Sequence, residues 1–167
     1  MRTKALLLAL LISACTSTQD LSSNSNVTEL AHLFVGYHER TNRSALRDLT
    51  GVDPVRTEWC AAFINAILEL EGIPGSNSLL ARSFLDWGEP VLREEIQRGD
   101  IVIFPRGREG WQGHVGFYVE TVVENGEERW KILGGNQDNT VSYALYNPKR
   151  SIGVRRYKVD NYGLGTF

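Results

Sequence analysis

The feature of this sequence that most constrains its fold is a change in the spacing of apolar residues near Gly99. Before this point apolar residues recur at three- and four-residue intervals, which is typical of helices packed on a core. After it they alternate with polar residues or run in short segments bounded by turns, which is typical of strands. Helices followed by a run of strands predict an α+β domain, with helices packed on an antiparallel sheet.

Three helical segments are expected before the change. The first covers 27–39, and a short helical or irregular linker closed by Gly51 follows it. The second lies between Thr57, a plausible N-cap, and Gly72, a plausible stop. Because almost every residue between them is apolar, most of this helix should be buried. The third is expected within "NSLLARSFLDWG", residues 77–88.

The strands are expected after Gly99. In the segment beginning at His114, Val115 and Phe117 alternate with His114 and Gly116, so His114 and Gly116 share a face. The Asn-Gly pair in "ENGE", at 124–127, is typical of a tight hairpin turn. The strand candidates are "GDIVIF", "HVGFYVETVV", "ERWKILGG", "TVSYAL" and "IGVRRYKV".

The N-terminus has the layout of an export signal. "MRTKALLLALLISAC" places basic residues before an apolar run that is too short for the roughly 20 residues of a membrane-spanning helix. "LISAC" resembles the lipobox of bacterial lipoproteins, which implies a signal peptide at 1–14 and a lipidated Cys15. Residues 15–26 then form a polar tether to a domain at 27–167. Because Thr16 is not the aspartate that favours inner-membrane retention of such lipoproteins, the resemblance implies the periplasmic face of the outer membrane. An ordinary secretory signal is the alternative.

The rest of the composition excludes several classes of function. A formal net charge of -2 lacks the basic footprint of a nucleic-acid-binding protein. With three histidines and no H-E-x-x-H or C-x-x-C pattern, no metal site is expected. No G-x-S-x-G motif of a serine hydrolase occurs. We expect a monomer that needs no cofactor.

Cysteine use makes Cys60 a lone thiol, which is expected to be intermolecular, buried and inert, or reactive. The chain has two cysteines, so a lipidated Cys15 would leave Cys60 without a disulfide partner. Cys60 is expected in the first turn of its helix, where the dipole and free N–H groups favour a thiolate. His114 is the candidate base, with space for a substrate beside it over Gly116. In "GGNQ", Asn136 or Gln137 could orient the imidazole.

Five sequence blocks together resemble a known family. "WCAAFIN", "LLARSFLDWG", "GDIVIF", "GHVGFY" and "LGGNQ" are similar, in this order, to the NlpC/CHAP group of papain-like cysteine hydrolases. The resemblance implies hydrolysis of amide bonds in peptidoglycan through a thioester. It implies Cys60 as nucleophile, His114 as base and acid, and Asn136 as the orienting residue. A catalytically inactive lipoprotein that binds peptidoglycan or an envelope partner is the alternative function.

The remaining site predictions concern the substrate. Trp111 lies in a glycine-rich loop before His114 and is expected to line a groove, whereas Trp59 and Trp87 are expected in the core. Gln137 is a further candidate for substrate binding. Glu58 is expected to point to solvent or to bind a substrate ammonium group.

Two arginines share the loop of Trp111. Arg106 and Arg108 could meet carboxylates of the peptide stem, but solvated loop charges are the expected role.

Overall fold

The computed structural model describes residues 23–157, which are built around a six-stranded sheet in the order β1-β6-β2-β3-β4-β5. Every pair of neighbouring strands is antiparallel. The strands are β1 (Glu89–Pro90), β2 (Ile101–Pro105), β3 (Gly113–Glu124), β4 (Glu127–Gln137), β5 (Thr140–Tyr146) and β6 (Gly153–Arg156). The α+β class and the antiparallel sheet are therefore confirmed, whereas the short strand β1 was not expected.

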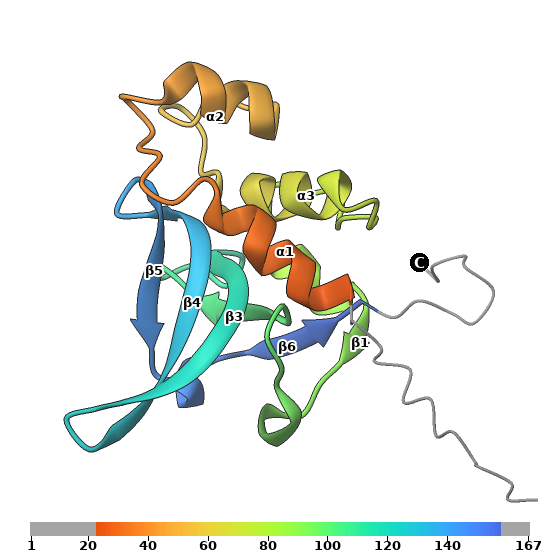
Figure 1. Cartoon of the computed structure of the whole chain (residues 1–167), viewed down its shortest axis with the longest axis vertical. Helices are drawn as coiled ribbons and strands as arrows, with labels where there is room; N and C mark the ends of the chain where they lie inside the picture. Colours follow the sequence, from red (N-terminus) through yellow and green to blue (C-terminus); the bar gives the residue numbers. More distant parts are fainter. Residues whose placement is uncertain (1–22, 158–167) are drawn as a thin grey trace, which may run out of the picture.

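Within residues 23–157, two of the three α-helices cover strands β3 and β4 of the sheet, and the remaining one packs on a helix. The three are α1 (Ser23–His32), α2 (Arg43–Thr50) and α3 (Cys60–Leu70). Figure 1 shows α1 and α3 side by side, and both contact β3 and β4, while α2 packs on α3. The shorter 3-10 helices are η1 (Ala81–Asp86), η2 (Arg93–Glu95) and η3 (Pro148–Arg150).

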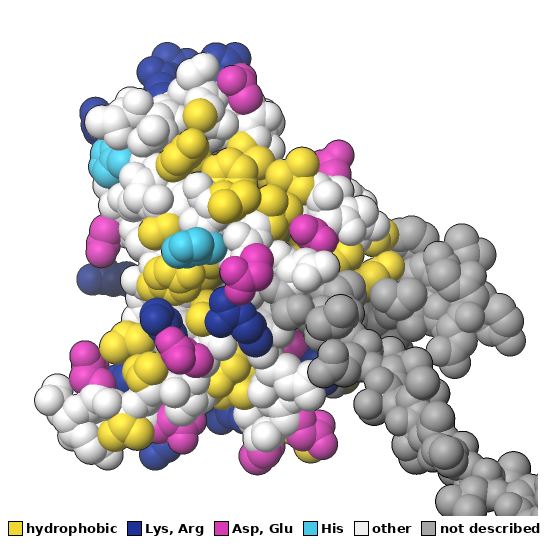
Figure 2. Space-filling view, in the orientation of Figure 1, with side chains coloured by type: hydrophobic (Ala, Val, Ile, Leu, Met, Phe, Trp, Pro, Cys, Tyr) yellow, Lys and Arg dark blue, Asp and Glu magenta, His cyan; other side chains and the backbone are white. Residues whose placement is uncertain are grey.

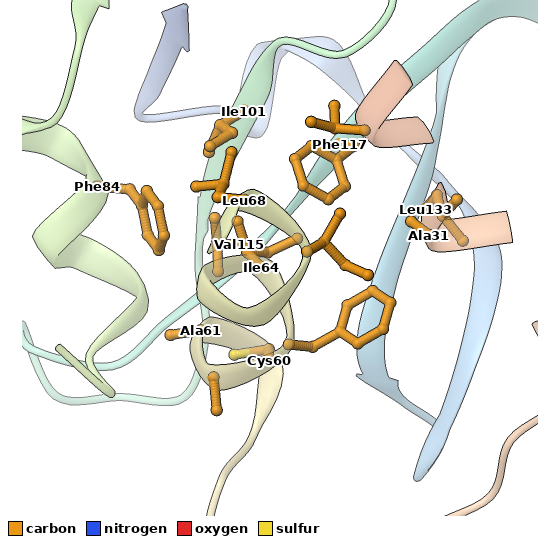
Figure 3. Close-up of a cluster of buried hydrophobic side chains, with 14 of the residues drawn as sticks. Ala31, Cys60, Ala61, Ile64, Leu68, Phe84, Ile101, Val115, Phe117 and Leu133 are labelled. Atoms are coloured by element: carbon orange, nitrogen blue, oxygen red, sulfur yellow. The ribbon is translucent and has the colours of Figure 1, made fainter. Parts of the chain in front are cut away.

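Helix α3 is the centre of the main core, as its apolar sequence predicts. Phe63, Ile64 and Ile67 have no exposed surface, and they pack in one cluster with Phe117 of β3 and Leu133 of β4. Figure 3 shows Ile64 and Leu68 of this helix close to Ile101, Val115 and Phe117 of the strands. Burying each large apolar side chain contributes about 1.5–3 kcal/mol to folding, so this interface fixes the position of α3 firmly.

The start of α3 differs from the prediction, whereas its end agrees with it. Trp59, not Thr57, occupies the N-cap position, so Cys60 is the first helical residue. The indole of Trp59 is fully buried, so packing rather than a side-chain cap determines where the helix begins. At the other end Gly72 adopts a φ of 70°, and the N–H of the next residue bonds back to Leu68 O at 2.8 Å.

The first helix is shifted relative to the prediction of 27–39. It begins at Ser23, within the segment expected to be a tether, and ends at His32. The next N–H groups donate to carbonyls three residues back, and Gly36 N–H then bonds to Val141 O of β5 at 2.9 Å. Pairing with the sheet edge therefore takes the chain out of the helix, and Leu33 is left 70% exposed.

The third predicted helix, over 77–88, forms only as the shorter 3-10 helix η1. Asn77 has a φ of 53°, which breaks the helical path at the expected cap. Ala81 and Phe84 are buried at a spacing of three residues, the repeat of a 3-10 helix. Leu79 and Leu80 precede η1 and stay about half exposed, at 48% and 50%.

The sheet has a second, smaller core on the other side of β3. Val115, Phe117 and Val119 belong to the cluster of α3, whereas Tyr118 packs with Trp130 in a separate cluster. This confirms that the side chains of the segment beginning at His114 alternate between the two faces of the sheet. The hairpin between β3 and β4 turns at Asn125–Gly126, both with positive φ, as the Asn-Gly pair predicts.

The surface in Figure 2 carries both signs of charge, interspersed around apolar side chains that gather over the helices. Within residues 23–157, no helix combines the length and apolar character needed to cross a bilayer.

Candidate active site

The fold places Cys60 at the junction of α3, β3 and an open cavity. Its thiol is free and only 3% of the residue is exposed, yet it lines a cavity of about 530 Å³. The other lining residues come from the start of α3, from the segment before η1 and from the loop between β2 and β3: Thr57, Glu58, Leu79, Leu80, Ala81, Arg106, Gly107, Trp111, Gln112 and Gly113. A substrate in this cavity would meet the thiol at the first residue of a helix.

The surroundings of Cys60 keep the thiol protonated in the free protein. Burial raises its pKa above the ordinary value. The backbone N–H groups of Val115 and Ala61 and the charge of Arg106 act in the opposite direction, but they do not outweigh burial. The N–H of Val115 is the group next to His114 along β3, so this contact places the thiol beside the strand that carries the candidate base.

His114 is buried, and Gln137 holds its ring. Nε2 of His114 lies 3.1 Å from Oε1 of Gln137, and the ring stacks on Tyr146 with centroids 5.6 Å apart. Burial, followed by the charge of Arg106, lowers the pKa of His114 to about 4, while the bond to Gln137 opposes this shift. The imidazole is therefore neutral at neutral pH.

The hydrogen bonds of Gln137 determine which nitrogen of His114 carries the proton. Nε2 of Gln137 donates to the carbonyl oxygens of Ser142 and Ile132, so its Oε1 must face His114. Tyr146 also donates to this Oε1, at 3.0 Å. An amide oxygen only accepts, so Nε2 of His114 is the donor and Nδ1 carries the lone pair. Nδ1 has no hydrogen-bond partner among residues 23–157.

Asn136 precedes Gln137 in the chain, but its side chain is directed to Glu58 and not to the imidazole of His114. Its φ is 57°, and its side-chain amide donates to Glu58 Oε2 at 2.7 Å. Its carbonyl oxygen accepts two long bonds of 3.4 Å from Arg106. The side chain that orients His114 in this structure is therefore Gln137. Asn136 was expected to orient the imidazole, but its side chain bonds to Glu58 instead.

Glu58 is directed toward solvent, with a side chain that is 80% exposed, and its carboxylate lies 3.8 Å from Nη1 of Arg106. Its bond to Asn136 was not expected.

Glycines allow the close approach of strands and helix at this site. A Cβ on Gly134 would lie 3.4 Å from Nε2 of His114, and one on Gly135 would lie 2.6 Å from the Trp59 ring. The open space predicted over Gly116 is wrong, because a Cβ there would lie 2.4 Å from Ile132 Cγ2. Gly116 lets β4 pack closely and does not provide room for a substrate.

Two cavities meet at Arg106. His114, Asn136, Gln137 and Tyr146 line a second cavity of about 270 Å³, which does not include Cys60. Arg106 and Gly107 line both cavities. A larger cavity of about 630 Å³ lies between α2, α3 and the segment at 73–79, away from His114.

The tryptophans are divided as predicted between core and surface. Trp59 is fully buried, and Trp87 is partly buried against the main core. Trp111 is 60% exposed and lines the cavity of Cys60. Leu79, Leu80 and Tyr146 also line the two cavities and were not predicted, because the helix expected over 77–88 gave no sign that the two leucines would lie outside it.

The part of the chain that the structure describes holds no group of three or more His, Cys, Asp or Glu side chains able to bind a metal ion.

Comparisons with known proteins identify a similar fold. No protein-family model and no curated protein sequence matches this chain. A crystal structure from Staphylococcus aureus, described as similar to lipoprotein and of the NLP/P60 family, matches with a TM-score of 0.54 and 21% identity. The match covers 82% of this chain but only 42% of that one. The chain therefore shares the α+β fold of an NLP/P60-family structure, which it spans for less than half of that protein's length.

Proposed function

We propose that this chain is a cysteine hydrolase that cleaves amide bonds of peptidoglycan, with Cys60 as the nucleophile and His114 as the base. One observation carries the proposal. The thiol at the first residue of α3 lines an open cavity and contacts the backbone N–H of Val115, the residue after His114. Among the described residues Nδ1 of His114 has no hydrogen-bond partner, and its Nε2 is held by Gln137. Nucleophile, base and orienting group are the three parts of thiol catalysis.

The proposed reaction begins with proton transfer from Cys60 Sγ to His114 Nδ1 as sulfur attacks the amide carbonyl carbon. The C–N bond then breaks, and the leaving amine takes the proton from Nδ1. Water next attacks the thioester carbonyl and gives a proton to Nδ1, which returns it to sulfur. The products are an amine, a carboxylic acid and the free thiol.

Two features of the site support this sequence of steps. Backbone N–H groups at the start of α3 have no helical partner and can stabilise the oxyanion. Both Cys60 and His114 are neutral in the free protein because burial opposes charge on each. The mechanism requires the thiol to turn toward Nδ1 when substrate is bound, and catalytic hydrogen bonds commonly tighten in this way.

Gln137 takes the orienting role in this proposal, in place of Asn136. Its Oε1 accepts from Nε2 of His114 and keeps the lone pair on Nδ1. Gln137 is thus a positioning residue and not a substrate ligand. Trp111 remains the proposed substrate-binding side chain, because its exposed ring borders the cavity of Cys60.

Peptidoglycan is proposed as the substrate on two grounds. The fold resembles that of a protein described as a lipoprotein-like member of the NLP/P60 family. The sequence blocks around Cys60, His114 and Gln137 resemble peptidoglycan hydrolases of the NlpC/CHAP group, and assignment to the CHAP type stays a prediction.

The cellular location is part of the same proposal. The signal at 1–14 and the lipidated Cys15 lie outside the described residues. Their lipobox-like sequence supports a lipid anchor in the cell envelope, on the periplasmic face of the outer membrane. This location would hold the domain next to its substrate.

Digestion of purified peptidoglycan tests the proposal. The full chain should release soluble fragments, whereas Cys60→Ala should release none while keeping its fold, because the lost group is small. Cys15→Ala is the matched control, since it makes the same change at the other cysteine and should remain active. Equal release by wild type and Cys60→Ala would exclude the thiol mechanism. Binding of peptidoglycan by a folded wild type that releases no fragments would favour the inactive lipoprotein.

A further inference from the structure

We propose that Arg106 binds a free carboxylate of the substrate, so that the enzyme selects acidic stem peptides whose carboxylate lies near the scissile amide. This inference rests on the proposed hydrolase function and adds the substrate class. Arg106 follows directly after β2, in the loop that also carries Trp111.

The first observation is the unused hydrogen-bonding capacity of Arg106. A guanidinium group has five N–H donors in a planar fork. Within residues 23–157, those of Arg106 make only two bonds of 3.4 Å, both to the carbonyl oxygen of Asn136. The Glu58 carboxylate lies 3.8 Å from Nη1, beyond hydrogen-bonding distance. Donors therefore remain for an incoming ligand.

The second observation is that Arg106 borders the cavities of both proposed catalytic groups, and its charge lowers the pKa of each. Among the residues that the structure describes, it is the one charged residue that lines both the cavity of Cys60 and the cavity of His114. A ligand carboxylate bound there would lie within a few atoms of the carbonyl attacked by the thiol.

The third observation is the distribution of charge around Arg106. In the cavity of Cys60 the charged residues are Arg106 and Glu58, and the Glu58 side chain is 80% exposed and is held by one hydrogen bond from Asn136 and a long ion pair with Arg106. In the cavity of His114, Arg106 and Arg150 face one acidic residue, Asp138. The junction of the cavities therefore favours an anion.

Carboxylate is the anion that fits this position in a peptidoglycan hydrolase. Arginine pairs with carboxylate through two parallel N–H···O bonds, which fix orientation as well as affinity. Stem peptides carry free carboxylates beside their amide bonds, and some of these groups occur as neutral carboxamides. Arg106 would distinguish the two forms because a carboxamide has no negative charge.

The experiment compares two muropeptides that differ only in whether the glutamate α-carboxyl is free or converted to carboxamide. Wild type should cleave the free acid with a kcat/KM about tenfold or more above that of the carboxamide, as loss of a charge-assisted hydrogen bond predicts. Arg106→Gln should cleave both at similar rates. Arg108→Gln, a matched change in the same loop, should keep the wild-type preference. Equal cleavage by wild type, or an unchanged preference in Arg106→Gln, would overturn the inference while leaving the proposed function intact.

A second measurement tests the anion site without peptide cleavage. Cys60 in the full chain is alkylated with iodoacetate, which is anionic, or iodoacetamide, which is neutral, and labelling is quantified at the Cys60 peptide by mass spectrometry. The rate with iodoacetate divided by the rate with iodoacetamide should fall several-fold in Arg106→Gln and stay unchanged in Arg108→Gln. If wild type cleaves neither muropeptide, the proposed function fails and this ratio alone decides the anion site. An unchanged ratio in Arg106→Gln would contradict it.

Discussion

His114 Nε2 lies 3.1 Å from Oε1 of Gln137, and this single contact fixes both the orientation and the tautomer of the candidate base. Because Gln137 also donates to Ser142 O and accepts from Tyr146, its amide cannot reverse without losing these bonds. The lone pair of His114 is therefore held on Nδ1, the atom that the proposed mechanism uses.

Removing this contact should lower catalysis more than removing the neighbouring Asn136 side chain. We expect Gln137→Ala to reduce kcat by about tenfold or more with little change in KM, because the wrong tautomer becomes accessible. Asn136→Gly is the control, since glycine tolerates the φ of 57° while the side chain is lost. Kinetics on a soluble muropeptide measure both variants. A larger loss of kcat in Asn136→Gly would restore Asn136 to the orienting role.

The contact between His114 and Gln137 could not be predicted from the sequence, although much of the fold could. The change in the spacing of apolar residues predicted the α+β class, the antiparallel sheet and the burial of α3. Such spacing directly determines which faces of a helix or strand are apolar. The choice between Asn136 and Gln137 does not follow from alternation, because the register of β4 and β5 shifts between Gly134 and Gln137. The positive φ of Asn136 interrupts the regular strand conformation at this point, so alternation along the sequence no longer indicates the direction of a side chain.

The error at Gly116 has a similar origin. A glycine next to a candidate base predicts space for a substrate, but the space over Gly116 is occupied by Ile132 from β4. Which partner fills the space over a glycine depends on strand order and register, and neither is visible in one local segment.

Burial of His114 predicts a loss of stability in acid. Its pKa falls from 6.5 to about 4 on folding, so between these values the unfolded chain binds a proton that the folded chain does not. Stability therefore decreases as the pH drops from 6.5 to 4, by up to about 3 kcal/mol for a shift of this size. Urea denaturation at pH 7 and pH 4.5 measures the change. His114→Gln should reduce this pH dependence, and the matched change at exposed His32 controls for loss of an imidazole. An identical pH dependence in wild type and His114→Gln would contradict the burial argument.

Gly135 should be the most size-sensitive glycine at the junction of β4 and α3. A Cβ there would lie 2.6 Å from the ring of Trp59 and 2.7 Å from Cβ of Phe63. We expect Gly135→Ala to destabilise the fold by about 1–3 kcal/mol through overpacking. Gly110→Ala is the control, because its Cβ would meet nothing within 4 Å. Denaturation midpoints of the two variants should differ clearly, and equal midpoints would refute the close packing.

Cys15 should anchor the protein to the membrane. Cys15→Ser is expected to move the chain from the membrane fraction to the soluble fraction, because acyl chains provide the proposed attachment. Fractionation of cells followed by immunoblotting measures this, with Cys60→Ser as the matched control that should stay in the membrane fraction. An unchanged distribution of Cys15→Ser would exclude lipidation as the anchor.

The most direct test of the central claim is partitioning of the acyl-enzyme between water and hydroxylamine during peptidoglycan digestion. A thioester on Cys60 predicts that wild type releases fragments partly as hydroxamates, in a proportion that rises with hydroxylamine concentration, while Cys60→Ala releases no fragments. Mass spectrometry of the products distinguishes hydroxamates from carboxylic acids. Fragments that are carboxylic acids at every hydroxylamine concentration, or fragments released by Cys60→Ala, would contradict the proposed thiol mechanism.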